Sequence, residues 1–179
     1  MTADRAYRVE HLSGPRVTLA DFIAEDVAAV HAFAGDPDVC AFTTWGPNTP
    51  AETAAFVGAA LHPQPNGFLL AVMSAGEVIG SASVWTTSEA DRAGELGYTL
   101  RRDRWGRGYG TEVAGLLMRL GFERLGLERL AATCAPENIG SVRVLEKAGM
   151  RREGLLRGHL LVRGHRRDSL LYARLRSDQ

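Results

Sequence analysis

The chain has 179 residues, and its 21 basic side chains balance 21 acidic ones, so the formal net charge is zero. A general nucleic-acid-binding protein usually carries a basic excess, so this balance argues against a nucleic-acid partner. The two cysteines, Cys40 and Cys134, stand far apart, which argues against a disulfide framework or a metal site. We see no apolar leader and no apolar run of membrane-spanning length, so we expect a cytoplasmic protein without a membrane partner.

The first half of the chain predicts two helices and three strands. Residues 16–20 alternate as in a short strand, and residues 21–33 carry apolar side chains at helical spacing. A second helix should begin after Thr49, because Pro50 suits the first helical position and Glu52 completes a capping box. Pro63 is expected to end this helix. Strands at residues 68–74 and 78–85 should then be joined by a tight turn.

The second half predicts further alternation of strands and helices. A strand at residues 94–100 leads into residues 101–112, and a helix at 111–125 should follow, closed by Gly126. A strand at 128–135, a helix within 136–149 and a hairpin turning at Arg163 and Gly164 complete the pattern. Because no repeat or linker interrupts this order, we expect a mixed α/β (α+β) fold in a single domain over residues 1–179, with its core at about 16–175.

Residues 101–112, RRDRWGRGYGTE, pack four arginines and three glycines around one tryptophan. Backbone N–H groups at the start of the following helix, with the positive end of its dipole, can bind an anion. Glycine lets a phosphate approach the backbone, and Arg102, Arg104 and Arg107 could add charge-assisted hydrogen bonds. The spacing fits neither a Walker loop nor a dinucleotide fingerprint. From these residues alone, a phosphate cradle and a solvated loop both stay open.

The chain resembles the GCN5-related N-acetyltransferase (GNAT) family, and within it the RimJ/RimL-like branch of ribosomal-protein and other N-terminal acetyltransferases. The stretches that carry the resemblance are ELGYTL, the long segment from RWGRGYGTEV to VLEKAGM, and REGLLR. It covers residues 16–175 in element order and is dense over residues 95–157. It implies the GNAT fold: a central, mixed and mostly antiparallel sheet flanked by helices, with one splayed pair of parallel strands.

The resemblance also implies acetyl-CoA as the cofactor. Gly108 and Gly110 match the second half of the family's pyrophosphate motif, whereas Trp105 stands where most members have Gln or Arg. Exposed backbone groups near Leu100 are expected to pair with the pantetheine amides, as in strand addition. The coenzyme-binding residues predicted in this way are Leu100, Arg102, Arg107, Gly108, Tyr109, Gly110, Thr111, Asn138 and Ser141.

Two catalytic residues follow from the same resemblance. Many members use a tyrosine as the acid where this chain has Leu145, whereas the RimJ/RimL-like branch keeps an Asn-x-x-Ser, matched by Asn138 and Ser141. We expect Ser141 to return a proton to the coenzyme sulfur, with Asn138 positioning it; the alternative is that both only cap the helix. Glu95 is the candidate base, acting through water, and an exposed strand-end acid is its alternative.

Other polar and aromatic residues leave more than one interpretation open. Counting outward from the hairpin turn places His159 opposite Asp168, where a carboxylate could orient the imidazole; a surface pair is the plainer alternative. Trp45 and Trp85 could line an acceptor groove or simply pack. Tyr109, Tyr172 and Cys134 are expected to pack in the core.

The expected reaction is acetyl transfer to a primary amine. Because the chain offers no obvious strong base, an α-amino group of a protein or peptide is a better acceptor than a lysine ε-amine. A small amine, such as an antibiotic or polyamine, is the first alternative, and a catalytically silent acyl-CoA-binding module is the second. A homodimer is one option for assembly.

Overall fold

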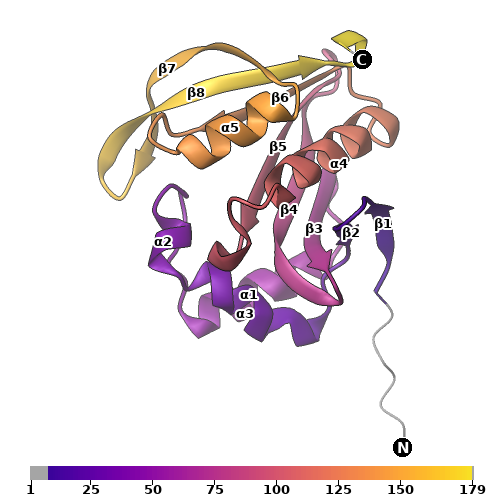
Figure 1. Ribbon diagram of the computed structural model, residues 1–179, viewed down its shortest axis with the longest axis vertical. Coiled ribbons are helices and arrows are strands. Elements are labelled where there is room, and N and C mark those ends of the chain that lie inside the picture. The colour runs from indigo at the N-terminus through magenta and orange to yellow at the C-terminus, as the bar shows by residue number, and fades with distance from the viewer. Residues whose placement is uncertain (1–7, 179) are drawn as a thin grey trace, which may run out of the picture.

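The computed structural model describes residues 8–178, and within them the strands form one eight-stranded sheet in the order β1-β2-β3-β4-β5-β6-β8-β7 (Figure 1). The strands are β1 (Glu10–Ser13), β2 (Thr18–Ala20), β3 (Gly67–Ser74), β4 (Glu77–Ser88), β5 (Ala93–Leu100), β6 (Arg129–Cys134), β7 (Arg151–Val162) and β8 (His165–Leu175). The helices are α1 (Val27–Ala34), α2 (Pro37–Cys40), α3 (Pro50–Ala60), α4 (Tyr109–Glu123) and α5 (Ile139–Lys147). The N-terminal residues 1–7, from which the lack of a leader was argued, lie outside the described residues.

One pair of neighbouring strands breaks the antiparallel pattern. β5 and β6 run parallel, and they pair only at Ala93–Arg129, Gly94–Leu130 and Glu95–Ala131. Beyond Glu95 the two strands part, so that the second half of β5 has no partner strand on that side. The splayed parallel pair implied by the family resemblance is therefore confirmed.

Helices cover both faces of the sheet (Figure 1). α4 packs its apolar stripe on β4, β5 and β6, with Leu117, Leu120 and Leu130 fully buried between them. α1 and α3 bury Phe33 and Val57 in a second cluster on the opposite face. In the described part of the chain, no helix combines the length and apolar character needed to cross a membrane.

The N-terminal third differs from the sequence expectation in three places. The helix predicted from residue 21 begins as a 3₁₀ turn at Ala24–Asp26, because the Asp26 carboxylate accepts the Ile23 N–H at 2.9 Å. β1 was missed, since its four residues are paired only by their contact with β2. α2 was also missed, although Asp36 caps it by accepting the Asp38 N–H at 2.9 Å.

The capping box before α3 is confirmed. Thr49 Oγ1 accepts the Glu52 N–H at 3.3 Å, and the Glu52 carboxylate accepts the Thr49 N–H at 2.7 Å. The bonds from Thr49 hold the pKa of Glu52 below its usual value. We expect Thr49→Ala to lower the free energy of unfolding by about 1 kcal/mol, measured by urea denaturation. Thr44→Ala, at an exposed threonine without a capping role, is the control, and equal stability of the two variants would contradict this expectation.

Candidate active site

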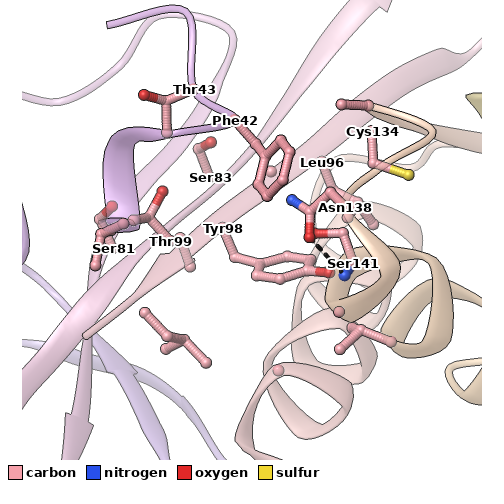
Figure 2. Close-up of a pocket in the computed structure, with 18 of the residues that line it drawn as sticks. Phe42, Thr43, Ser81, Ser83, Leu96, Tyr98, Thr99, Cys134, Asn138 and Ser141 are labelled. Carbon is pink, nitrogen blue, oxygen red and sulfur yellow. Dashed lines mark hydrogen bonds between the residues drawn. The ribbon is translucent and has the colours of Figure 1, made fainter. Parts of the chain in front are cut away.

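A cavity of about 1040 Å³ opens where β5 and β6 part (Figure 2). One wall is formed by the second half of β5 and the first turns of α4 and α5. The other is formed by β4, the segment from α1 to the start of α3, and the β7–β8 hairpin. Ligand pockets are usually about 300–1,000 Å³, so there is room for a large coenzyme and part of a second substrate.

The first turn of α4 presents unpaired backbone donors to this cavity. Gly108 is the N-cap residue, with φ +82°, and offers no side chain to cap the helix. The first hydrogen bond that closes a turn of α4 joins the Glu112 N–H to the Gly108 carbonyl at 3.3 Å. The N–H groups of Tyr109, Gly110 and Thr111 therefore lack helical acceptors, and all three residues line the cavity. This arrangement fits a phosphate group.

Gly110 is required by packing as well as by its backbone donor. A Cβ added there would lie 2.9 Å from Val144 Cγ2 in α5 and 3.7 Å from the Tyr98 ring. A larger residue at this position would require the Val144 side chain, which packs between α4 and α5, to shift. The glycines of the motif therefore leave the anion site open and also allow α4 and α5 to approach closely.

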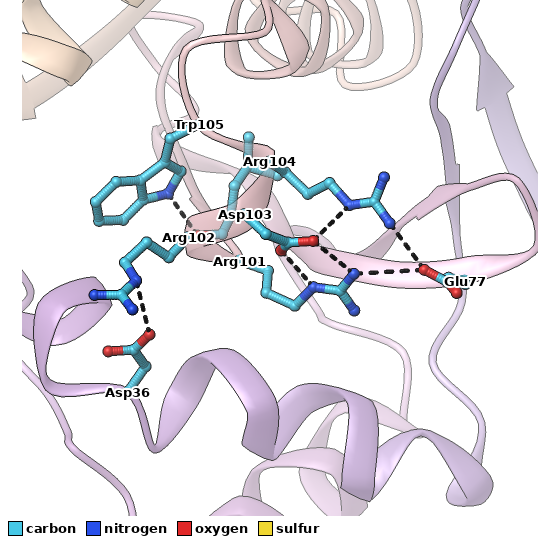
Figure 3. Close-up of polar contacts among 8 residues, drawn as sticks. Asp36, Glu77, Arg101, Arg102, Asp103, Arg104 and Trp105 are labelled. Atoms are coloured by element: carbon cyan, nitrogen blue, oxygen red, sulfur yellow. Dashed lines mark hydrogen bonds and ion pairs between the residues drawn. The ribbon is translucent and has the colours of Figure 1, made fainter.

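The charges of the arginine-rich turn are largely neutralised (Figure 3). Arg101 pairs with Asp103 at 2.6 Å, and Arg104 pairs with Asp103 at 3.3 Å and Glu77 at 2.9 Å. The same pairing lowers the pKa of Asp103, chiefly through its hydrogen bond from Arg101. Arg104 reaches the cavity wall, but its charge is already matched. Two of the four arginines of this turn, Arg101 and Arg104, are therefore engaged within the turn and with β4.

Two arginines expected at the coenzyme do not line the cavity. Arg102 turns toward α2, where it pairs with Asp36 at 3.8 Å (Figure 3). It also pairs with Asp38. The acidic start of α2, which the sequence analysis did not foresee, holds Arg102 outside the cavity, and its contact with the coenzyme stays a prediction. Arg107 is exposed outside the cavity, and only its backbone carbonyl makes a contact near the glycines.

Arg16 supplies a contact that the sequence did not reveal. Its Nη1 donates to the Arg107 carbonyl at 2.7 Å, and its Nε donates to Glu112 at 3.0 Å. Its guanidinium also lies 4.8 Å from the centre of the Tyr109 ring. Arg16 thus ties the β1–β2 connection to the glycine turn, and it holds the helix start in place.

Trp105 stands at the position where this chain departs from the family's pyrophosphate motif. Its indole N–H donates to the Leu100 carbonyl at 2.8 Å, and its ring is 47% exposed at the cavity. The Arg101 N–H donates to Ile79 in β4, so the preceding Leu100 carbonyl points to the open side of β5. Trp105 therefore closes the last open carbonyl of the strand.

The open edge of β5 lies at Leu96 and Tyr98. The backbone N–H and C=O groups of successive residues point to alternate edges of a strand. Those of Leu96 and Tyr98 therefore point the same way as those of Leu100, into the gap left by β6. Both line the main cavity, and both line a smaller one of about 100 Å³ at the point of separation. Leu96 and Tyr98 therefore offer both backbone groups to a ligand, whereas Leu100 offers its N–H, because Trp105 occupies its carbonyl.

Asn138 and Ser141 meet at the start of α5. Asn138 Oδ1 accepts the Ser141 N–H at 3.1 Å, so Asn138 is the helix cap. Because this bond uses the backbone of Ser141, the serine hydroxyl stays available to both cavities. The capping alternative therefore holds for Asn138 but leaves the side chain of Ser141 for another role.

Tyr98 is the polar residue at this point that sequence reasoning missed. Figure 2 shows its hydroxyl pointing toward Ser141, and burial raises the pKa of Tyr98 to about 12, with Ser141 opposing the rise. The phenol oxygen nevertheless has no hydrogen-bond partner of normal geometry within residues 8–178. The alternation of residues 95–100 could have placed Tyr98 beside Leu96, but its contact with α5 is long-range.

Cys134 ends β6 beside the same small cavity (Figure 2). Burial raises the pKa of its thiol to about 11. The thiolate is the nucleophilic form of cysteine, so at neutral pH Cys134 is a weak nucleophile. The site favours direct transfer to an acceptor over an acyl-cysteine.

The acceptor side of the cavity carries Glu95 and a set of hydroxyls. Glu95 is paired with Trp85 across β4 and β5, and Ser81 is paired with Thr99. All four side chains line the cavity. Trp45 also lines it, so both tryptophans lie at the cavity, and their contact with an acceptor stays a prediction.

The expected pairing of His159 with Asp168 is wrong. A β-bulge between Leu156 and Leu160 shifts the register of β7. The Asp168 carboxylate accepts the Gly158 N–H at 2.6 Å, and His159 Nδ1 lies 3.1 Å from Ser169 Oγ. Tyr172 packs as expected, and its hydroxyl donates to Glu146 at 3.2 Å.

Comparison with known proteins identifies the family of the chain. The model of the acetyltransferase (GNAT) domain matches residues 16–151. The uncharacterized N-acetyltransferase p20 of Bacillus licheniformis is 29% identical, over 95% of this chain and 98% of its own length. The uncharacterized N-acetyltransferase YnaD of Bacillus subtilis is 30% identical, over 82% of this chain and 86% of its own.

Solved structures agree with this result. A GNAT-family acetyltransferase from Bacillus anthracis superposes with a TM-score of 0.85 at 28% identity, covering 93% of this chain and 98% of its own. Mycobacterium smegmatis RimJ, solved in complex with CoA-disulfide, gives a TM-score of 0.78 at 26% identity, covering 90% of this chain and 83% of its own. With its domain match, its splayed β5–β6 pair and its glycine turn, the chain belongs to the GNAT family of acetyl-CoA-dependent acetyltransferases.

Proposed function

We propose that the chain transfers the acetyl group of acetyl-CoA to the α-amino group of a protein or peptide. The observation that carries this proposal is one continuous cavity, which joins the open N–H groups of α4 to Ser141 and Glu95. Acetyl transfer to an amine needs an anion site for the coenzyme, a proton donor for the leaving sulfur and an acceptor for the amine proton. The resemblance to the RimJ/RimL-like branch of N-terminal acetyltransferases, together with the structural similarity to RimJ, supports a protein N-terminus as acceptor.

We assign the coenzyme pyrophosphate to the N–H groups of Tyr109, Gly110 and Thr111, where the helix dipole also favours negative charge. The open backbone groups of Leu96 and Tyr98 pair with the pantetheine amides as an added strand would. When bound, acetyl-CoA supplies a thioester whose C–S bond breaks as the amine nitrogen bonds to the carbonyl carbon. A backbone N–H of β5 polarises that carbonyl.

Ser141 is the proposed proton donor to the departing sulfur. Its backbone is fixed by Asn138, and its hydroxyl faces the cavity where β5 and β6 part. Tyr98 keeps its proton at neutral pH, because its pKa is raised to about 12. Its phenol can therefore donate to Ser141 Oγ and stabilise the oxygen as the serine proton leaves.

Glu95 is the proposed acceptor of the amine proton, through a water molecule. A free α-amine has a reference pKa of about 7.7–8.0, whereas a lysine side chain has about 10.4. A single carboxylate is a weak base, so an amine that is already partly neutral at pH 7 is the better acceptor.

The test is a pH–rate profile of coenzyme A release for wild type and Glu95→Gln. One peptide offers only an α-amine, and its partner offers only a lysine ε-amine. We expect faster transfer to the α-amine and, for Glu95→Gln, a loss near neutral pH that recovers as free amine accumulates. Glu89→Gln, at an exposed acid outside the cavity, should match wild type. Faster transfer to the ε-amine would reject the preference, and superimposable profiles would remove Glu95 as the base.

A small amine is the second candidate acceptor. Phe42, Trp45 and Trp85 line the acceptor side and supply an apolar wall that suits a compact molecule. Coenzyme A release with an antibiotic or polyamine, but with no peptide, would favour this candidate. A silent acyl-CoA-binding module would release coenzyme A with none of these amines.

A further inference from the structure

Arg167, in β8, is an arginine of the cavity wall with no partner. Its Nε is buried without a hydrogen-bond partner, and among residues 8–178 its guanidinium makes no ion pair or side-chain hydrogen bond. Two arginines near the hairpin turn are engaged: Arg163 donates to the Gly46 carbonyl at 2.8 Å, and Arg166 donates to the Gly158 carbonyl at 3.2 Å. Arg152 and Arg157 are exposed and lie outside the cavity. Arg167 is thus a positive charge directed at the cavity.

The position of Arg167 places it on the acceptor side. Side chains alternate along β8, and Tyr172 faces α5 through its bond to Glu146. Arg167 and Ser169 therefore face the opposite side of the sheet, and both line the cavity. Glu95 lies on the corresponding face of β5, across the gap between the splayed strands. The coenzyme side, at α4 and α5, is separate from this wall.

The two charged side chains of the acceptor side do not pair with each other. Glu95 and Arg167 line the same cavity, yet no ion pair joins them in the described residues. The buried Nε of Arg167 has lost water without gaining a partner, which is costly, and the planar fork of the guanidinium matches a carboxylate. Ser81 and Thr99 add hydroxyls that suit a polar ligand.

We propose that the acceptor carries a carboxylate in addition to its amine, and that Arg167 binds this carboxylate while the amine lies toward Glu95. This inference rests on the proposed function and specifies its substrate class. A polyamine fits poorly, because its second ammonium would face the unpaired guanidinium.

The experiment uses three matched pairs of tripeptides with free α-amines. The first pair has Glu or Gln at position two, the second has Glu or Gln at position three, and the third has a free or amidated C-terminus. Steady-state coenzyme A release gives kcat and KM for each peptide. In at least one pair we expect the carboxylate to lower KM by about tenfold, as a charge-assisted hydrogen bond would.

The variants assign this preference to one side chain. Arg167→Gln should bring the KM values of that pair within about twofold at unchanged thermal stability, and Arg167→Lys should restore part of the difference. Arg157→Gln, on the same hairpin but outside the cavity, should keep the wild-type preference. No preference in any pair, or a preference that survives Arg167→Gln, overturns the inference. Absence of coenzyme A release from every peptide would instead refute the transfer to α-amines on which it rests.

Discussion

Ser141→Ala is expected to lower turnover by about 10²–10⁴-fold, the usual contribution of a general acid, while coenzyme A affinity stays near wild type. This substitution leaves the helix cap intact, because Asn138 caps α5 through the backbone N–H of Ser141 at 3.1 Å. Alanine keeps that bond and removes only the hydroxyl. Single-turnover kinetics with a peptide acceptor, beside calorimetry of coenzyme A, separate the two quantities.

Two further variants identify the role of Ser141. Asn138→Ala removes the cap, so it should lower the free energy of unfolding by about 1 kcal/mol, as is typical of a lost N-cap. Tyr98→Phe should reduce turnover less than Ser141→Ala, because it removes a group that acts through the serine. If Ser141→Ala turns over like wild type while Asn138→Ala is strongly impaired, the segment only caps the helix.

Gly108→Asp should weaken coenzyme A binding by at least about tenfold with the fold retained. The new carboxylate would stand at the N-cap of α4, where the open N–H groups and the phosphates meet. Gly108→Asn is the matched control, since both residues tolerate the left-handed φ of +82° and only Asp adds charge. Either side chain must displace Arg16, whose Nη2 lies 3.1 Å from the added Cβ position.

Calorimetry with coenzyme A gives the affinity of both variants, and circular dichroism confirms the fold. Unchanged affinity in Gly108→Asp would rule out the cradle. Equal losses in the two variants would mean that added bulk or the displacement of Arg16, rather than charge, is responsible, and would contradict the expected repulsion between the new carboxylate and the phosphates.

Local signals in the sequence predicted local structure well. The Thr49–Glu52 capping box, the turn at Arg163 and Gly164 and the glycine start of α4 each depend on neighbouring residues alone. The α4 helix begins at Tyr109, two residues earlier than its apolar stripe suggests, because Gly108 already serves as the N-cap. The splayed β5–β6 pair came from the family resemblance, since no residue pattern reports the partner of a strand.

What sequence reasoning missed depends on contacts between distant segments. Arg102 could not be placed, because its partners Asp36 and Asp38 precede it by more than sixty residues. His159 was misplaced because it lies within a β-bulge, where extra residues of β7 leave it without a regular partner on β8. The partnerless state of Arg167 is likewise a property of the folded cavity.

The central claim is that the gap between β5 and β6 holds acetyl-CoA with its thioester at Ser141. A crystal structure of the complex with coenzyme A tests it most directly. We expect the pyrophosphate oxygens within hydrogen-bonding distance of the Tyr109, Gly110 and Thr111 N–H groups, and the sulfur within reach of Ser141 Oγ. A pyrophosphate bound away from the start of α4, or a sulfur out of reach of Ser141, would contradict the account.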